Sequence, residues 1–406
     1  MTNPYAVIFR APGTKGFAAA GFIARLPIAM EAIGIVAMLS QTHGEYWLAG
    51  AVSATFALTN ALVAPQISRM VDRYGQTRLL VPATLVSVLA FAMLMVATHL
   101  RWPIWTLFVA ALFAAAMPSM PAMVRARWTE IFRGRPELNT AFAFESVADE
   151  LVYIAGASLS VGLSVSLFPE AGVLASTLFL AVGSTAFILQ RGTEPAVRPM
   201  LGARSSAILL RPVQIITFVL IFIGAIFATA EVSTVALTKE LGQPGAASFV
   251  IGVYAVGSFL VGVVVGALNL RMALQRQLLI AVAIIAVTTL PLLVADTVPA
   301  LALAIFVSGV AISPTLITAF GLIERRVPAA LLTEGITWVM TGIGIGMALG
   351  AFATGLVVDT FGARNGFWVS VAASIIALLT VLLAQRTLGA DDCDASVGAA
   401  ACEPAK

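Results

Sequence analysis

Five ionisable side chains lie inside long apolar stretches, where a charge is expensive to place. They are Arg25, Glu31, Asp149, Glu150 and Glu231. If these stretches cross a membrane, counting ~1.5 Å per residue puts Arg25, Asp149 and Glu150 near mid-depth. A charge there costs roughly 3 to more than 10 kcal/mol unless it faces water or a partner. We therefore expect one polar network, in which Arg25 pairs with Asp149 or, failing that, with Glu150.

Glu31 and Glu231 are separated by 200 residues, and both are expected in the outer half of the membrane. Burial disfavours the ionised form of a carboxylate, so both are candidate proton carriers. The alternative is that they are solvated vestibule residues or form gate pairs. For Arg25 and Asp149 the alternative is a static ion pair that holds two helices together.

Composition supports the membrane interpretation. The chain has 406 residues, of which 60% are hydrophobic and 11% charged, and its mean hydropathy is +0.99. Soluble domains have about 25% charged residues, so the bilayer must be the solvent of this chain. The net charge of +3 comes from short clusters between apolar stretches, so nucleic acid is not an expected partner.

Motifs of hydrolases and ATPases are absent from the sequence, and the two cysteines, Cys393 and Cys402, lack the spacing of a metal site. We therefore expect no enzyme activity, metal or cofactor. A receptor that binds a ligand without transporting it is the remaining non-transport alternative.

Apolar runs of about 20 residues, long enough to cross a ~30 Å hydrocarbon core as helices, occur twelve times. The runs are 15–39, 46–67, 79–98, 103–125, 139–167, 170–190, 212–237, 245–270, 277–296, 299–323, 332–358 and 365–386. Arginines are concentrated in alternate short loops between them. These arginines are Arg69, Arg73, Arg78, Arg125, Arg127, Arg133, Arg135, Arg271, Arg276, Arg325 and Arg326. The positive-inside rule then places these loops and both termini in the cytoplasm.

The chain divides into two halves of six helices. We expect an N-terminal bundle (1–190), a cytoplasmic linker (191–211), a C-terminal bundle (212–388) and a disordered cytoplasmic tail (389–406). Similar segments recur at an offset near 200 residues, as Met117-Pro118-Ser119 and Ser313-Pro314-Thr315 do. Paired six-helix repeats are an alternating-access architecture, with the substrate site between the halves near mid-membrane.

The loop after the second apolar run carries a recognisable motif. Residues 68–78 read Ser-Arg-Met-Val-Asp-Arg-Tyr-Gly-Gln-Thr-Arg, which resembles the G-x-L-A-D-R-x-G-R-R signature of the major facilitator superfamily. Asp72, Arg73 and Gly75 match, whereas Ser68 replaces the leading glycine, and Gln76 and Thr77 replace the basic pair. Gly75 permits a tight turn, and Asp72 can sit at a helix N-terminus and pair with arginines across a cytoplasmic gate.

The resemblance implies an all-α integral membrane protein with twelve helices in two pseudo-symmetric six-helix bundles. It also implies a central cavity lined by helices 1, 4, 7 and 10, into which Glu31 and Glu231 would face. Three segments, 25–27, 125–128 and 333–338, resemble the bacterial branch grouped with sugar and drug efflux permeases. The fourth helix, 103–125, is expected to carry no charge before Arg125, which would leave Arg25 as the one deep basic residue.

The expected function is secondary active transport by alternating access, most simply proton-coupled export of a small lipophilic or drug-like molecule. Proton-coupled or facilitated uptake of a small organic acid or sugar, anchored by Arg25, is the alternative. The protein is expected to be a monomer in a bacterial inner membrane, driven by the proton gradient. Candidate substrate contacts are Asn60, Tyr254, Thr315 and Trp338, and candidate cytoplasmic gate residues are Asp72, Arg73, Gly75, Glu145 and Glu334.

Overall fold

The computed structural model describes residues 4–43, 46–197, 206–243, 246–268 and 272–389, and this described part contains helices but no strand. The first half of the molecule comprises α1 (Pro4–Ile8), α2 (Thr14–His43), α3 (Tyr46–Tyr74), α4 (Gln76–His99), α5 (Ile104–Ala114), α6 (Met120–Phe132), α7 (Glu137–Ser166), α8 (Ala171–Ile188) and η1 (Arg191–Thr193). The second half comprises η2 (Ala207–Leu209), α9 (Arg211–Glu240), α10 (Ala246–Ala267), α11 (Leu274–Thr288), η3 (Leu290–Val294), α12 (Val298–Gly309), α13 (Ile312–Arg326), η4 (Ala329–Leu331), α14 (Leu332–Phe361), η5 (Ala363–Gly366) and α15 (Phe367–Gly389).

The long helices have the dimensions of membrane spans. Eleven segments of the described part are long and apolar enough to cross a bilayer, and α5 is a shorter apolar helix. A helix of 30 residues, such as α2, α7, α9 or α14, is about 45 Å long at 1.5 Å per residue. Large exposed apolar side chains such as Leu383 (86%) and Leu62 (70%) cover the outside, where lipid tails would contact them.

The expected fourth crossing is built differently from the sequence prediction. It is broken into α5 and α6 around Pro118, because proline has no amide hydrogen and its ring clashes with the preceding helical turn. The helix then resumes at Met120 and continues to Phe132. Arg125 and Arg127 therefore lie on α6 and are fully buried, so the prediction that they occupy a loop was wrong.

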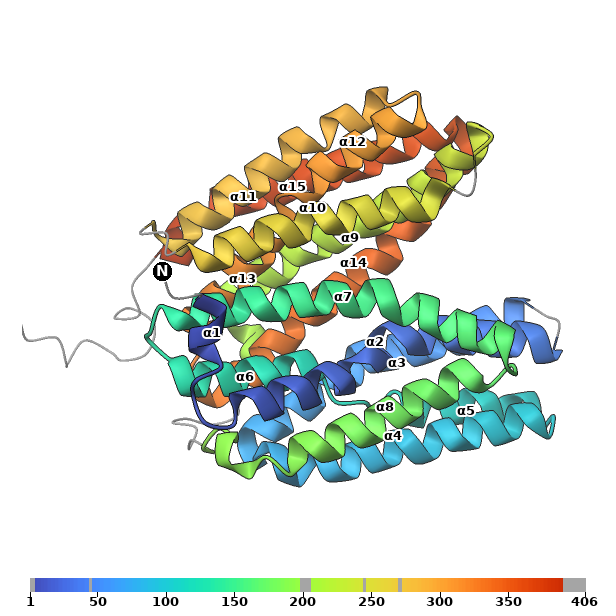
Figure 1. The fold of residues 1–406 in the computed structure, drawn as a ribbon, viewed down its shortest axis with the longest axis vertical. Coiled ribbons are helices and arrows are strands. Elements are labelled where there is room, and N and C mark those ends of the chain that lie inside the picture. Colours follow the sequence, from blue (N-terminus) through green and yellow to red (C-terminus); the bar gives the residue numbers. More distant parts are fainter. Residues whose placement is uncertain (1–3, 44–45, 198–205, 244–245, 269–271, 390–406) are drawn as a thin grey trace, which may run out of the picture.

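The corresponding crossing of the second half is interrupted in a similar way. α12 ends at Gly309 and α13 begins at Ile312, with Pro314 in its first turn. The two breaks coincide with the similar segments at Pro118 and Pro314, and each places a polar helix, α6 or α13, at the same end of the molecule (Figure 1).

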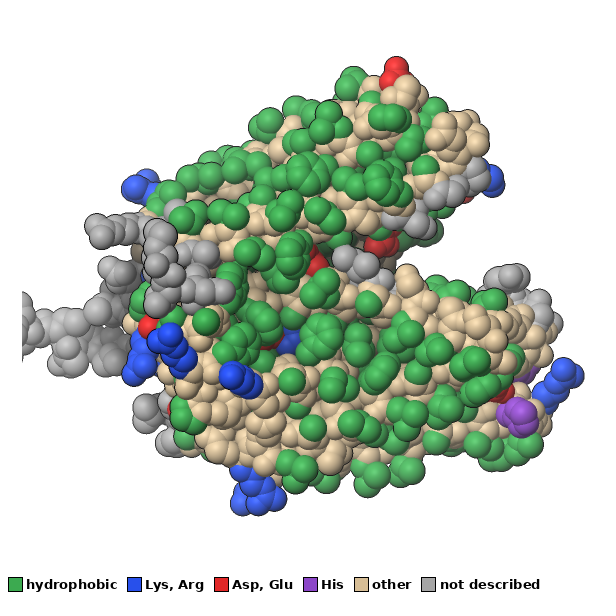
Figure 2. Space-filling view, in the orientation of Figure 1, with side chains coloured by type: hydrophobic (Ala, Val, Ile, Leu, Met, Phe, Trp, Pro, Cys, Tyr) green, Lys and Arg blue, Asp and Glu red, His purple; other side chains and the backbone are tan. Residues whose placement is uncertain are grey.

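Two groups of helices form the molecule. Figure 1 shows α2–α8 in one group and α9–α15 in the other, close together near α6 and α13 and diverging toward the opposite end. Figure 2 shows a hollow between the two groups at that opposite end, with acidic side chains on its walls, and most of the visible Lys and Arg side chains at the closed end. We call the closed end, which carries α1, α6 and the start of α14, the basic end, and the other the open end.

Close helix packing holds the second half together. α9 and α14 lie in extended contact, and small residues let their backbones approach. A Cβ atom added to Gly346 would lie 1.8 Å from the carbonyl oxygen of Ile221, and one added to Gly224 would lie 2.2 Å from that of Ile343. Only glycine fits at these two positions without displacing a helix.

Candidate functional site

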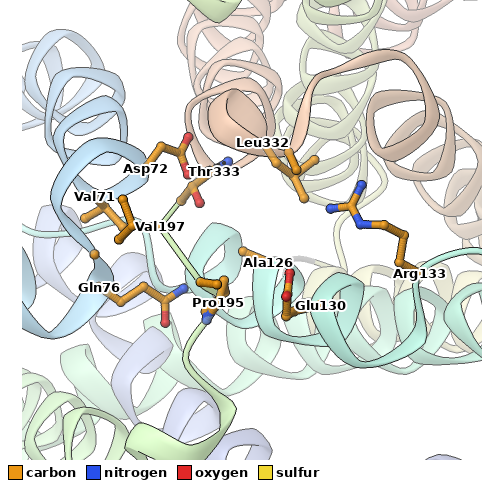
Figure 3. A pocket seen from close by; sticks show the side chains of 13 residues that line it. Val71, Asp72, Gln76, Ala126, Glu130, Arg133, Pro195, Val197, Leu332 and Thr333 are labelled. Carbon is orange, nitrogen blue, oxygen red and sulfur yellow. Dashed lines mark hydrogen bonds between the residues drawn. The ribbon is translucent and has the colours of Figure 1, made fainter. Parts of the chain in front are cut away.

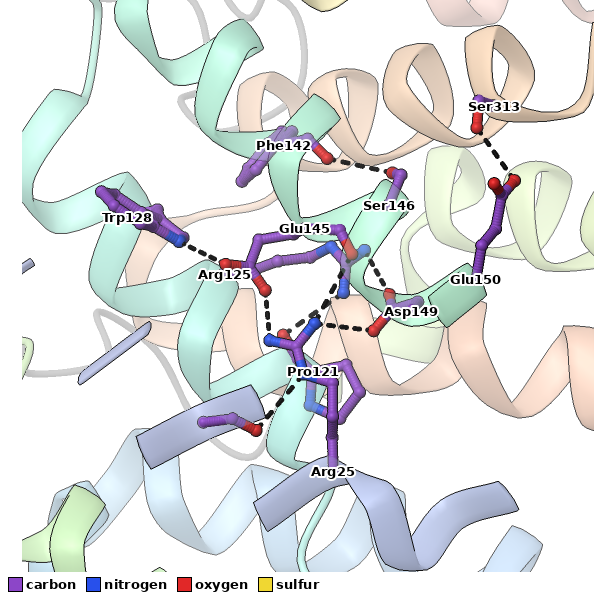
Figure 4. A network of polar contacts seen from close by, with 11 residues as sticks. Arg25, Pro121, Arg125, Trp128, Phe142, Glu145, Ser146, Asp149, Glu150 and Ser313 are labelled. Atoms are coloured by element: carbon purple, nitrogen blue, oxygen red, sulfur yellow. Dashed lines mark hydrogen bonds and ion pairs between the residues drawn. The ribbon is translucent and has the colours of Figure 1, made fainter. Parts of the chain in front are cut away.

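A cluster of four charges, three of them buried and the fourth, Asp149, 12% exposed, lies between α2, α6 and α7 (Figure 4). Arg25 on α2 donates from Nη1 to Oδ1 of Asp149 at 2.8 Å, and its Nη2 pairs with Oε2 of Glu145. Arg125 on α6 donates from Nη2 to the other Asp149 oxygen, Oδ2, at 2.7 Å. The two guanidinium groups are 1% and 0% exposed. The cluster is formally neutral, with two positive and two negative side chains.

Helical spacing creates this cluster. Glu145 and Asp149 are four residues apart on α7, so they share a face. Arg125 and Trp128 are three residues apart on α6, and the Trp128 indole donates to Oε1 of Glu145 at 2.7 Å. Glu145 therefore belongs to the cluster, and its assignment to the cytoplasmic gate was wrong.

Arg125 also reaches the second half. Its guanidinium lies 4.1 Å from the ring centroid of Phe320 on α13, a cation–π distance. The sequence prediction that Arg25 is the one deep basic residue is therefore corrected, since two arginines share Asp149. The α6 sequence held a signal for this, because Pro118 predicts a helix restart after it and hence a helical Arg125.

Glu150 points away from the cluster and toward the second half (Figure 4). It follows Asp149 directly, and a rotation of about 100° per residue turns it to another face of α7. Its Oε1 accepts hydrogen bonds from Ser313 of α13 at 3.0 Å and from Ser258 of α10. Its Oε2 is buried and has no partner among the described residues. The sequence analysis did not predict either serine, because the residues around a serine do not indicate whether it contacts the other half of the molecule.

Glu31 lies inside the first half rather than on the central groove. It is 0% exposed, and its Oε1 accepts a hydrogen bond from Ser176 of α8 at 2.6 Å. Its other carboxylate oxygen is buried without a partner in the described part of the chain. The expectation that Glu31 faces a cavity between the halves was therefore wrong. The side chain of Glu31 instead lies inside the bundle, where Ser176 on α8 donates a hydrogen bond to it.

Glu231 of α9 is exposed and lies close enough to interact electrostatically with Tyr153 of the first half and Tyr254 of α10. Tyr153 is 40% exposed, so these groups belong to the wall of the groove between the halves. Glu31 and Glu231 are 200 residues apart, as the repeat predicts, but Glu31 is buried and Glu231 is exposed.

The four candidate substrate contacts differ in whether their polar groups already form hydrogen bonds within the protein. Asn60 donates to the carbonyl of Ala115 at 3.0 Å, at the α5–α6 break, and Thr315 donates to Ala311 of the preceding turn at 2.8 Å. Trp338 donates to Glu334 at 3.3 Å. The hydroxyl of Tyr254 is buried and has no hydrogen-bond partner among the described residues. Of the four, Tyr254 therefore keeps an unused polar group beside the groove.

Asp72 joins the halves at the basic end. Its Oδ2 accepts from the backbone N–H of Glu334 at 2.8 Å and its Oδ1 from that of Thr333 at 3.2 Å. These are unpaired amides of the first turn of α14, where a negative charge is favoured. Close by, Thr337 donates to Ser68 at 2.7 Å. Asp72 thus sits at a helix N-terminus, and its acceptance of two amides replaces the expected pairing with arginines.

The other gate candidates surround this contact. Gly75 has φ +95°, a backbone conformation that favours glycine, and the guanidinium of Arg73 lies 5.3 Å from the Tyr74 ring centroid. Glu334 accepts a hydrogen bond from Ser206. Figure 3 shows Asp72 directed toward Thr333 beside a cavity of about 30 Å³, which has room for water but not for an organic substrate.

The fold and the C-terminal part of the sequence match known proteins. Residues 215–392 match the model of the Major Facilitator Superfamily. The chain also superimposes on a bacterial homologue of the iron transporter ferroportin in an outward-facing state, with 16% identity, a TM-score of 0.70 and coverage of 92% of this chain and 99% of that one. Residues 215–392 thus resemble the Major Facilitator Superfamily in sequence, and the whole chain shares the fold of the ferroportin homologue. No curated protein matches it.

Two further solved transporter structures resemble this chain over nearly all their length. The Escherichia coli fucose:proton symporter FucP has 14% identity and a TM-score of 0.67, with 90% of this chain and 98% of that chain covered. The human organic anion transporter MFSD10 has 14% identity and a TM-score of 0.69, with coverage of 91% and 100%. Identities this low show a shared fold and leave the cargo of this chain open. The superfamily match points to a multi-pass membrane transporter rather than an enzyme.

Proposed function

We propose that this protein is a proton-coupled secondary transporter that works by alternating access. In this proposal the basic end faces the cytoplasm, and the structure represents the outward-open state of a monomer in a bacterial inner membrane. Closure at the basic end, the hollow at the open end and the excess of arginines at the closed side support this orientation.

Glu150 carries the proposal. It is the acid that bonds directly from the first half to hydroxyl groups of the second half, and it has no ion pair among the described residues. An ionised carboxylate without a basic partner is costly at low dielectric, so proton binding relieves that cost. Protonation also removes the charge that strengthens hydrogen bonds from Ser258 and Ser313. Proton uptake would thereby loosen the contact between the halves.

The neutral cluster beside Glu150 has a different role in this proposal. Asp149 accepts hydrogen bonds from two arginines that lie on two different helices. The cluster instead fixes α2, α6 and α7 relative to one another, one residue away from Glu150. It also keeps Arg125 over the ring of Phe320 in the second half. A movement of the second half would therefore change the environment of the Arg125 charge.

We propose export of a small lipophilic or drug-like molecule. Tyr153 and Glu231 on the groove wall would offer such a molecule an aromatic surface and a carboxylate. Uptake of a small organic acid or sugar is the second candidate, favoured by the two buried guanidinium groups if an opening of the cluster exposes them.

Flux measurements in proteoliposomes under an imposed pH gradient test this function. Compounds that raise the unfolding temperature of the purified protein supply the trial substrates. We expect substrate movement against the proton flow, whereas movement with the protons would favour uptake. The variant Glu150→Gln should lose proton-driven accumulation but keep exchange of substrate across the membrane.

Glu31→Gln is the matched control, because Glu31 is also a buried acid but bonds only within the first half. It should retain proton-driven accumulation. Full coupling in Glu150→Gln would contradict the assigned proton site.

A further inference from the structure

The end of α14 repeats, at the open end, the turn that carries Asp72 at the basic end. Residues 71–75 read Val-Asp-Arg-Tyr-Gly, and residues 358–362 read Val-Asp-Thr-Phe-Gly. In both segments an aspartate lies three residues before a glycine that ends a long helix. Asp359 is therefore the sequence equivalent of Asp72.

The two turns also have the same backbone geometry. Gly75 has φ 95° and ψ 155°, and Gly362 has φ 89° and ψ 162°. A glutamate accepts a backbone N–H just after each glycine: Glu194 from Thr77 at 2.8 Å, and Glu240 from Ala363 at 2.8 Å. Such agreement in unusual dihedral angles and in capping is a second observation, independent of the sequence likeness.

Helix direction determines what each aspartate can meet. α3, of 29 residues, and α14, of 30 residues, pack against each other across the two halves. Asp72, near the last residue of α3, contacts the first turn of α14, so α3 runs toward the basic end and α14 runs away from it. The last turn of α14, with Asp359, and the first turn of α3 must therefore both lie at the open end.

Asp359 is exposed and makes no hydrogen bond or ion pair within the described residues. The first turn of α3, which begins at Tyr46, has backbone N–H groups that no carbonyl of the same helix can accept. The open end thus has the same groups as the basic end: an aspartate near the end of one helix and the free backbone N–H groups at the start of the other. In this structure the two groups at the open end are not in contact.

We propose that Asp359 is the outer gate residue of the transport cycle. When the open end closes, its carboxylate accepts the backbone N–H groups of Trp47 and Leu48, as Asp72 now accepts those of Thr333 and Glu334. The two contacts alternate, since closing one end of the molecule opens the other. This assignment rests on the proposed alternating-access function.

Cross-linking tests the contact directly. Cys393→Ser and Cys402→Ser remove the native thiols, and Asp359→Cys is combined with Trp47→Cys in membranes treated with an oxidant. We expect a disulfide, because the cycling transporter brings these positions together. Asp296→Cys with Trp47→Cys is the control, since Asp296 is an exposed acid of the second half outside the repeated turn. No cross-link in the first pair, or equal cross-linking in both, would overturn the assignment.

Distance measurements between spin labels at Ser166→Cys and Asp296→Cys, near the outer ends of the two halves, test the energetics. In an Asp72→Asn background, adding Asp359→Asn should raise the ratio of outward-open to inward-open molecules about tenfold, the factor expected for a lost charge-assisted hydrogen bond. Thr360→Ala, the neighbouring control, should leave the ratio unchanged. An unchanged ratio in Asp359→Asn contradicts the proposal.

The flux assay distinguishes a failure of the Asp359 assignment from a failure of the proposed transport function. Proton-driven transport in the wild-type protein, together with a failure of both Asp359 experiments, would remove the outer gate residue and leave the proposed function standing. A wild-type protein that shows no transport for any stabilising ligand would instead count against the proposed function itself.

Discussion

Asp149 is the point at which two buried arginines meet, and this shapes the behaviour of the whole cluster. Removing one member leaves an uncompensated charge at low dielectric, which costs about 3–5 kcal/mol in buried ion pairs. Removing an oppositely charged pair preserves neutrality. Arg125 and Glu145 would still balance each other if Arg25 and Asp149 were both replaced.

The double variant Arg25→Met with Asp149→Leu should therefore fold, with a free energy of unfolding within about 2 kcal/mol of the wild type. It should lose coupled transport, because α2 would no longer be tied to α7 beside Glu150. Arg25→Ala alone should be both unstable and inactive. Thermal unfolding and proteoliposome flux give the two readouts, and retained coupling in the double variant would show that the pair is only structural.

At the scale of elements, α14 takes part in both ends of the cycle and in the core of the second half. Its face toward α9 is lined by Gly342, Gly346 and Gly350, whereas Gly344 has open space around it. Its first turn receives Asp72. One helix thus combines tight packing inside its own half with a polar contact to the other half.

The glycines of α14 give a matched pair of substitutions. Gly346→Ala would place a methyl group 1.8 Å from the Ile221 carbonyl oxygen, so it should lower the free energy of unfolding by about 1–3 kcal/mol through overpacking. Gly344→Ala meets no atom within 4 Å and should be neutral or stabilising. Unfolding temperatures in the same detergent measure both, and equal effects would contradict the observed packing.

Asp72→Asn should weaken the contact at the start of α14 by about 1–3 kcal/mol, because an amide oxygen accepts backbone N–H groups less strongly than a carboxylate. The population should shift toward the inward-open state and turnover should slow, with little change in unfolding temperature. Cysteine accessibility from the cytoplasmic face measures the shift. Arg276→Gln, which removes an exposed positive charge at the start of α11, is the control. Unchanged accessibility and flux would make the turn between α3 and α4 an ordinary helix connection without a gating role.

On the scale of the whole molecule, several polar contacts join the halves toward the basic end. Asp72 joins α3 to α14, Glu150 joins α7 to α10 and α13, and the hydroxyl of Tyr5 in α1 donates to the carbonyl of Val263 in α10 at 2.8 Å. Polar contacts of this kind can be exchanged for others, which suits an interface that must open and close.

The orientation of the whole molecule is testable at the linker, residues 191–211. Its residues 198–205 lie outside the described part of the chain, as does the tail at 390–406. With Cys393 and Cys402 replaced, Ser205→Cys should react with a membrane-impermeant thiol reagent added to inside-out vesicles. Reaction from the outer face alone would reverse the topology.

Much of this molecule could be predicted from local sequence. Apolar runs determine where helices cross a membrane, because each unsatisfied backbone group in lipid costs several kcal/mol. The depth of Arg25 and Asp149 likewise predicted their pairing in a polar network, since few arrangements tolerate charge at that depth. Contacts between distant segments were not predictable. That Arg125 joins the cluster, that Glu31 turns toward Ser176 and that Glu150 bonds to Ser258 and Ser313 depend on helix rotation and crossing, which are set by packing among many side chains rather than by any one helix.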